Sequence, residues 1–351
     1  MRARWHVRLI GALLVACGIV VVPCALHSGE GAKAPAGGGG ARAGQYTISE
    51  PIAYENLTIF MIHGKDRIKG TKFLTLKEAL EKKVAVLHET GSVGRLTIQN
   101  LGDVPIYVQS GDIVKGGKQD RTLQWDMVVP AKSGKVPLKS FCVEQRRWSQ
   151  RGRESADKFD SSRNMLASKD LKLAAKSAGN QGEVWREVDR TKKKLSANLG
   201  VNVSSAQSAS SLALALDNKQ LREAVDKYVK KLAKAPEGRK GVVGFAFAIN
   251  GEVNSIDVYA SSALFRKLWP KLLKASATEA VAERKKDGRF PAVKVAAVEA
   301  LIAEMQKGKA STTDLSKRIR LRKSESASAV VFDTLLVGEG DVSVHTNYIK
   351  K

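Results

Sequence analysis

Residues 111–121 read Gly111-Asp112-Ile113-Val114-Lys115-Gly116-Gly117-Lys118-Gln119-Asp120-Arg121. We call this segment the basic turn, because it gathers lysines, an arginine and two aspartates around a Gly-Gly pair, between two runs typical of β-strands. Glycine lets backbone N–H groups approach a phosphate closely, and Lys118 and Arg121 add positive charge. The basic turn therefore predicts contact with an anion. The alternative is a tight strand connection whose charged side chains pair with one another.

A second segment rich in reactive side chains follows: Cys142-Val143-Glu144-Gln145-Arg146-Arg147-Trp148. The period-two pattern of the strand that precedes it places Cys142 and Glu144 on one face. We expect this strand end and the basic turn to approach a shared cleft from opposite sides. Trp148, just beyond the strand, could stack on a base or sugar.

Glu144 and Asp112 are the candidate catalytic residues, because acid–base catalysis commonly uses two carboxyl groups in different surroundings. Alternatively, Glu144 pairs with Arg121 or Arg147 and braces the fold. Cys142 is a nucleophile if basic neighbours lower its thiol pKa, and otherwise an inert buried side chain. The histidines lack i,i+4 spacing, so no metal site is predicted. The candidate ligand-binding residues are Lys115, Gly116, Gly117, Lys118, Gln119, Asp120, Arg121, Arg147 and Trp148.

Residues 1–28 have the pattern of a targeting segment. Arginines precede an apolar run from Leu9 to Val22, as in a secretory signal, and the run is shorter than a typical membrane span. Leu14-Val15-Ala16-Cys17 resembles a bacterial lipobox, which would place a lipid on Cys17. Ordinary cleavage near Ser28 and an uncleaved anchor are the other routes. We expect an exported protein, periplasmic or extracellular.

Residues 29–44 are rich in Gly, Ala and Pro, which predicts a flexible linker. The chain of 351 residues has a formal net charge of +24, and a strongly basic surface favours anionic partners. A small anionic ligand, an anionic envelope polymer or a membrane surface fits this charge, and so does a surface that is simply solvated. Nucleic acid is not expected, because an exported protein seldom meets it and the aromatic residues are not interleaved for stacking.

The body of the chain, residues 45–350, predicts one α+β domain. Its N-terminal part reads as a β-rich, sandwich-like sheet, beginning with the apolar run 57–62. Residues 96–98 and 106–108 resemble the two arms of a hairpin. We expect helices and a C-terminal hairpin and strand region to pack on this sheet.

Three local signals within the body are more specific. Thr75 and Glu78 have capping-box spacing at the start of a short helix. Asn250-Gly251 between two apolar runs predicts a type I′ hairpin turn. The helix expected after Ser262 contains Pro270, which should kink or split it.

Taken together, these segments resemble the ARG and rhodanese-phosphatase superfamily associated protein domain. The basic turn is similar to the first block of that family, and Cys142-Val143-Glu144 with Arg147-Trp148 is similar to its Cys-Val-Glu-x-Gly-Arg-Trp block. Gln181-Gly182-Glu183-Val184-Trp185 resembles a third block. Three residues depart from the usual pattern: Asp112 stands for Glu, Asp120 for Asn and Arg146 for Gly.

The family name implies genomic association with ADP-ribosylglycohydrolases and phosphatases, and hence nucleotide-derived or phosphorylated ligands. Three functions stay open. The domain binds a small anionic, nucleotide- or phosphosugar-like ligand between the basic turn and the Cys142–Trp148 segment. Alternatively, it hydrolyses a phosphate- or ribose-bearing substrate with Glu144 or Asp112 as acid and base, or it is a non-catalytic envelope protein with a core locked by salt bridges. The sequence identifies no cofactor and no oligomeric state.

Overall fold

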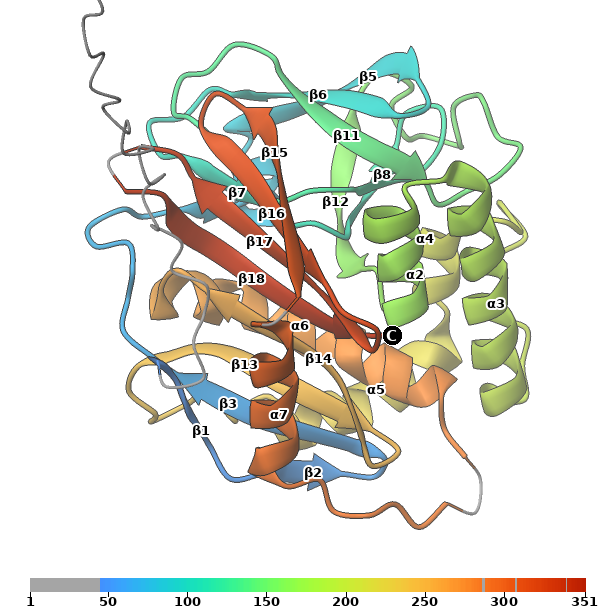
Figure 1. Cartoon of the computed structure of the whole chain (residues 1–351). Coiled ribbons are helices and arrows are strands. Elements are labelled where there is room, and N and C mark those ends of the chain that lie inside the picture. Colours follow the sequence, from blue (N-terminus) through green and yellow to red (C-terminus); the bar gives the residue numbers. More distant parts are fainter. Residues whose placement is uncertain (1–44, 286–287, 307, 339) are drawn as a thin grey trace, which may run out of the picture. The chain divides into compact units, whose positions relative to one another are not determined.

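The computed structural model describes residues 45–351 except 286, 287, 307 and 339 (Figure 1). The segments predicted as leader and linker, residues 1–28 and 29–44, lie outside the described residues. Helices and mainly antiparallel strands alternate along the described chain without a repeating βαβ pattern, which confirms the α+β class. The helices are α1 (Leu76–Glu81), α2 (Lys169–Leu173), the π-helical turn η2 (Ala174–Ala178), α3 (Gln181–Leu199), α4 (Leu212–Leu216), α5 (Lys219–Leu232), α6 (Ser262–Ala282) and α7 (Val295–Met305).

The largest sheet joins strands from both ends of the described chain. Its order is β1-β3-β13-β14-β18-β17-β16-β15, with β2 also paired to β3, so the C-terminal strands continue the sheet that β3 begins. All of these pairs are antiparallel. The strands are β1 (Thr47–Ile48), β2 (Ile52–Tyr54), β3 (Leu57–His63), β13 (Val242–Ile249), β14 (Glu252–Tyr259), β15 (Lys309–Ser316), β16 (Ile319–Glu325), β17 (Ala329–Leu336) and β18 (Val342–Lys350).

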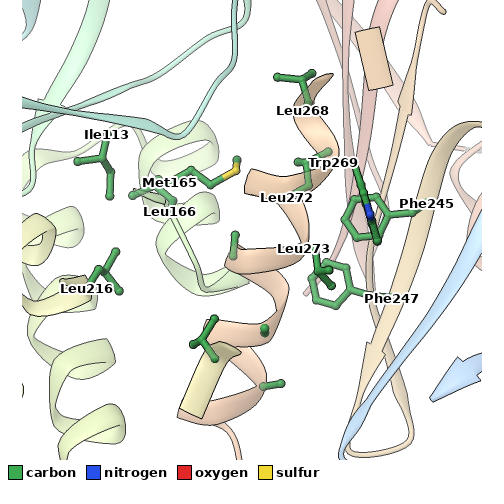
Figure 2. Packing of buried hydrophobic residues seen from close by; sticks show 14 of the residues in the cluster. Ile113, Met165, Leu166, Leu216, Phe245, Phe247, Leu268, Trp269, Leu272 and Leu273 are labelled. Carbon is green, nitrogen blue, oxygen red and sulfur yellow. The ribbon is translucent and has the colours of Figure 1, made fainter. Parts of the chain in front are cut away.

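Both faces of this sheet are covered at β3 and β13, which explains their nearly continuous apolar sequences. Phe245 and Phe247 point to the cluster that contains α6, while Ala246 and Ala248 point to the cluster that contains α7. Figure 2 shows Leu273 and Trp269 of α6 against Phe245 and Phe247. The buried strand predicted at residues 57–62 is confirmed as β3.

Helix α6 continues through Pro270 and is not split there. On one side it packs on β13, and on the other Leu268 and Leu272 lie toward Met165, as Figure 2 shows. Pro270 is exposed, so this residue falls on the face of α6 that is turned away from the core. That face becomes important for the candidate site.

Two smaller sheets carry the segments singled out in the sequence. One has the order β12-β8-β9-β11-β6-β5 and the other the order β10-β7-β4. The hairpin expected from residues 96–98 and 106–108 is wrong, because β6 pairs with β5 and β11 whereas β7 pairs with β10 and β4. The strands are β4 (Leu74–Thr75), β5 (Ala85–Ser92), β6 (Arg95–Asn100), β7 (Ile106–Val108), β8 (Asp112–Gly116), β9 (Arg121–Leu123), β10 (Met127–Val129), β11 (Val136–Cys142) and β12 (Phe159–Met165).

The local signals at Thr75 and at Asn250-Gly251 are confirmed. Thr75 caps α1, and its hydroxyl accepts from the Glu78 N–H while the Glu78 carboxylate accepts from the Thr75 N–H. Asn250 and Gly251 connect β13 to β14 and have φ values of 55° and 83°, as a type I′ turn requires. Within the described residues, no helix combines the length and the apolar character needed to cross a bilayer.

A buried charged cluster joins β14 and β18 of the large sheet to Asp126, the residue that directly precedes β10. Both ring nitrogens of His345 lie 3.0 Å from a carboxylate, Nδ1 from Asp126 and Nε2 from Asp257. Lys176 of η2 donates to Asn347, which in turn donates to Asp257. Burial opposes the charged form of His345, but the two aspartates overcome this effect and raise the pKa of His345 above its ordinary value.

Candidate functional site

The basic turn and the Cys142–Trp148 segment are in direct contact, but no cavity found among the described residues is lined by both. The Asp120 N–H donates to the Glu144 carboxylate at 2.9 Å, and the Val143 N–H donates to the Asp120 carbonyl at 3.0 Å. Asp120 and Glu144 are both 0% exposed. Two carboxylates are thus brought together in the interior, where each needs cationic or N–H partners.

Arg147 and Arg151 supply those partners and occupy the space between the two segments. Arg147 donates to both Glu144 oxygens at 2.8 and 2.7 Å, and to the Gly117 carbonyl at 2.9 Å. Arg151 donates to both Asp120 oxygens at 2.8 and 2.9 Å. Such bidentate pairs are the strong form of the arginine–carboxylate interaction. We call this group of Asp120, Glu144, Arg147 and Arg151 the ion-pair lock.

The lock keeps Glu144 ionised. Burial opposes ionisation, but hydrogen bonds from Arg147, Ser208 and the Asp120 N–H prevail, so the pKa of Glu144 lies below its ordinary value. A carboxylate that is fully buried, paired twice and reluctant to accept a proton is poorly suited to general base catalysis. The arrangement corresponds to the alternative in which Glu144 pairs with Arg147 and braces the fold.

The two glycines of the basic turn serve packing. Gly116 donates its N–H to the Asp120 carboxylate, and Gly117 donates its N–H to the Ser155 carbonyl, so neither group points at a ligand. Both have positive φ, and a Cβ at Gly117 would lie 2.2 Å from the Phe159 ring. Glycine is therefore required here by close approach of β12.

Arg121 is also fully buried, but its carboxylate partner is Glu89 at 3.3 Å and not Glu144. Arg121 also donates a hydrogen bond from Nη1 to the Gln119 carbonyl at 2.8 Å. Trp148 is 44% exposed, and Lys118 Nζ and Arg121 Cζ lie 5.3 and 5.6 Å from its ring centroid. Trp148 and Arg146 are therefore the large side chains of the two segments that solvent reaches freely.

The third sequence block fastens the second. Gln181, the first residue of α3, accepts from the Cys142 N–H and donates to the Cys142 carbonyl, both at 2.8 Å. Trp185 donates its indole N–H to the Glu144 carbonyl at 3.3 Å. The three blocks are therefore neighbours in space, linked by hydrogen bonds that an interior position makes obligatory.

Asp112 lies apart from Glu144, so the structure does not form the predicted acid–base pair. Asp112 begins β8 and Gly116 ends it, which separates them by about 13 Å along an extended strand. The partner of Asp112 is Lys271 of α6, at 2.5 Å. Lys115, which alternates to the other side of β8, pairs with Asp217 at 3.0 Å.

Asp112 instead belongs to the wall of a different cavity, which we call the α6 pocket. Its volume is about 310 Å³. Lys267, Lys271 and Lys274 have i, i+4 and i+7 spacing and so share one face of α6, the face that also carries Pro270. The lining residues are Thr75, Lys77 and Glu78 at the start of α1, Asp112, Arg163 of β12, and Lys267, Leu268, Pro270, Lys271 and Lys274 of α6.

The charges in the α6 pocket are unequally paired. Lys267 pairs with Glu78 at 3.1 Å, and Lys271 pairs with Asp112. Lys77 pairs with a residue outside the lining set, Glu81, at 2.7 Å. Arg163 and Lys274 make no ion pair within the part of the chain that the structure describes. The pocket therefore presents two cations without a carboxylate partner.

Three pKa values in this pocket are displaced from their ordinary values: hydrogen bonds from Thr75 and Lys267 outweigh burial and lower that of Glu78, and those of Asp112 and Lys274 are displaced as well. Burial raises the pKa of Asp112, with Lys271 acting in the opposite direction and Asp126 adding to the rise. Burial also lowers the pKa of the Lys274 amine, and the positive charges of Arg163 and Arg222 lower it further, against Asp217 and Asp226. Displaced values in a cavity are typical of functional sites.

A family model, described as the ARG and Rhodanese-Phosphatase-superfamily-associated Protein domain, matches residues 45–349. The chain belongs to this family. No curated protein and no solved structure matches it.

Of the three motif blocks that carry the family resemblance, the first two supply Asp120, Glu144 and Arg147 to the ion-pair lock, and the third, beginning at Gln181, is hydrogen-bonded to the second. Arg146, where the family motif usually has glycine, has a φ of 72°, a left-handed conformation that glycine adopts without strain. Cys142 is buried, and burial raises the pKa of its thiol to about 11, which opposes a role as nucleophile. No group of metal-ligating side chains occurs among residues 45–351 as described.

Of the residues predicted for the site of this ARG and rhodanese-phosphatase associated domain, Asp112 alone lines the α6 pocket. Sequence reasoning missed Arg163, Lys267, Lys271 and Lys274. A signal existed for the three lysines, because their helical spacing aligns them in a helix whose apolar face was already evident. Arg163 is placed beside them only by the tertiary structure.

Proposed function

We propose that the domain binds a small anionic ligand, and that the α6 pocket holds it. One observation carries the proposal: five basic and two acidic side chains line the pocket, and Arg163 and Lys274 have no carboxylate partner among the described residues. A cation without a carboxylate partner in a concave wall is a favourable partner for a phosphate or carboxylate group; Lys274 is partly buried and Arg163 is exposed.

The pocket also limits the kind of ligand. A volume of about 310 Å³ is at the lower end of the range for small-molecule sites. Leu268, Pro270 and the methylene stems of the lysines supply apolar surface. We expect a ligand with one or two anionic groups and a compact organic part, such as a nucleoside monophosphate or a sugar phosphate.

A titration of this pocket tests the proposal. Thermal unfolding is followed with inorganic phosphate, adenosine monophosphate and ribose 5-phosphate, for the wild type and for Arg163→Ala. We expect at least one of these ligands to stabilise the wild type and Arg163→Ala to lose most of that shift. Arg153→Ala is the matched control, since Arg153 is exposed, makes no ion pair with another described residue and lies outside the pocket. Equal shifts in all three proteins would refute the assignment.

For the residues of the ion-pair lock, we propose a structural role. Support comes from their burial and from hydrogen bonds that already use Glu144, Asp120 and the N–H groups of the two glycines. A core locked by salt bridges was one of the three functions left open by the sequence. It is compatible with ligand binding in the α6 pocket, because the two groups of residues are separate.

Hydrolysis of a phosphate- or ribose-bearing substrate is the second candidate function, and Asp112 is the observation that favours it. Its carboxyl group is in the pocket wall, contacts Lys271 and has a raised pKa, as an acid–base group requires. Turnover of such a substrate that is lost in Asp112→Asn, while phosphate still stabilises the variant, would support it. Turnover retained in Asp112→Asn would exclude Asp112 from that role.

Export is a proposal that depends on residues 1–28 alone. We propose that they direct the chain to the periplasm or the cell exterior, where its positive charge can meet anionic envelope polymer or membrane surface. Cell fractionation of the complete chain and of a chain lacking these residues tests it. Equal cytoplasmic recovery of both would contradict it, and replacement of Cys17 by Ser distinguishes lipidation from the other routes.

A further inference from the structure

Lys274 differs from the other three lysines of the α6 pocket. Lys77, Lys267 and Lys271 each have a carboxylate within 3.1 Å. Lys274 Nζ has neither an ion pair nor a hydrogen bond among the described residues, although the side chain is only half-exposed and lines the cavity. An ammonium group that gives up part of its hydration without gaining a partner is disfavoured relative to the neutral amine.

The surroundings of Lys274 act in the same direction. Burial and the nearby charges of Arg163 and Arg222 lower the pKa of its amine, while Asp217 and Asp226 only partly offset them. Lysine becomes a nucleophile in such settings, desolvated or next to another cation, because the neutral amine has a free lone pair. Lys271, one turn earlier on the same face, does not meet this condition, since its ammonium group is paired with Asp112.

We propose that Lys274 is a nucleophile that forms an imine with a carbonyl-bearing anion, a 2-oxo acid or an aldehyde or ketone carrying phosphate, held in the α6 pocket by Arg163. This inference depends on the proposed anion site and specifies its class of ligand. Arg163 binds the anionic group, and the amine of Lys274 meets the carbonyl carbon.

Imine formation at Lys274 conserves atoms and charge. The lone pair of the neutral Lys274 amine forms a C–N bond, the carbonyl π pair moves to oxygen, and that oxygen takes a proton while nitrogen releases one. The resulting carbinolamine loses its hydroxyl group as water after a second protonation, and the nitrogen lone pair forms the C=N bond. Amine, carbonyl compound and one proton thus give a protonated imine and one water, without any oxidant or reductant.

Reductive trapping tests the inference. The complete chain is incubated with glyoxylate and cyanoborohydride, and labelled lysines are located by peptide mass spectrometry. Because binding beside Arg163 raises the local concentration of the probe, we expect Lys274 to be labelled at least roughly tenfold faster than Lys230, an exposed lysine of α5. The rate at Lys274 should reach its plateau at a lower pH than that at Lys230. Lys274→Arg keeps the charge and should lose the fast adduct.

Labelling of Lys274 no faster than Lys230 would overturn the inference. Thermal shifts with inorganic phosphate, recorded on the same samples, separate it from the proposed function. A phosphate shift without selective labelling would leave the anion site standing and remove the nucleophile. If Lys274 is labelled selectively, but phosphate neither slows this labelling nor raises the melting temperature, the proposed anion site is refuted. A circular dichroism spectrum of Lys274→Arg establishes that the variant is folded.

Discussion

Substitution of Glu144 by Gln distinguishes a structural from a catalytic role for the ion-pair lock. The Glu144 carboxylate accepts from Arg147 twice, from Arg151 at 3.3 Å and from the Asp120 N–H. Glutamine keeps one acceptor oxygen but turns an NH2 group toward arginine donors, so about two charge-assisted bonds are lost at roughly 1.5–3 kcal/mol each. This agrees with the roughly 3–5 kcal/mol expected when one partner of a buried pair is removed.

We therefore expect Glu144→Gln to lower the free energy of unfolding by about 3–5 kcal/mol, measured by urea denaturation. The melting temperature should fall by about 6–10 °C, taking roughly 2 °C per kcal/mol for a domain of this size. Glu81→Gln is the control, because the Lys77–Glu81 pair has a similar length of 2.7 Å but is exposed and should contribute less than about 1 kcal/mol. Equal stability of both variants would refute the structural role of Glu144 and return it to the candidates for catalysis.

Three further changes test other parts of the structure. Gln181→Ala removes both hydrogen bonds to the Cys142 backbone and should cost roughly 2–4 kcal/mol in urea unfolding; a loss below about 0.5 kcal/mol would contradict the fastening role. Arg146→Gly removes the strain of a left-handed non-glycine residue, about 1–2 kcal/mol, but glycine also makes the unfolded chain more flexible. We expect the free energy of unfolding to rise by up to about 1 kcal/mol. A clear decrease would contradict this account. Because the pKa of His345 is raised in the folded protein, its protonation stabilises the fold fully below about pH 6.5. This stabilisation is lost as the pH rises through the pKa of the folded state, so the urea midpoint should fall. The fall should be absent in His345→Asn.

Local structure was predictable wherever it depended on neighbours in the sequence. The capping box at Thr75 and the turn at Asn250-Gly251 are determined by short-range chemistry, and both occur as predicted. The mistaken hairpin at residues 96–108 shows the limit. Asn100 donates its side-chain amide to the Val104 and Pro130 carbonyls, and β6 and β7 then enter different sheets. Period-two patterns identify strands without identifying their partners.

The site was harder to predict, because buried ion pairs and catalytic groups use the same residue types. In the sequence, the pattern of Asp120, Glu144 and Arg147 is typical of a catalytic or ligand-binding site. The same pattern is equally typical of a buried ion-pair network in which each charge has a partner. Burial is what separates the two interpretations, and it is a property of the assembled fold. Arg151 was recognisable only as one more charge in a basic stretch, although it completes the lock.

The lock and the pocket also differ in how they treat charge, and this difference has a functional consequence. In the lock, Asp120 and Glu144 receive so many donors that no site is left for a solute. In the α6 pocket, Arg163 and Lys274 line a cavity, and neither has a carboxylate partner among the described residues. An anionic ligand can therefore supply the partner that the protein does not. β8 connects the two, since Asp112 at one end reaches the pocket and Gly116 at the other reaches the lock. A rigid lock therefore fixes the strand that positions Asp112 against Lys271, which is why the most charged segment of the sequence can support a binding site without lining it.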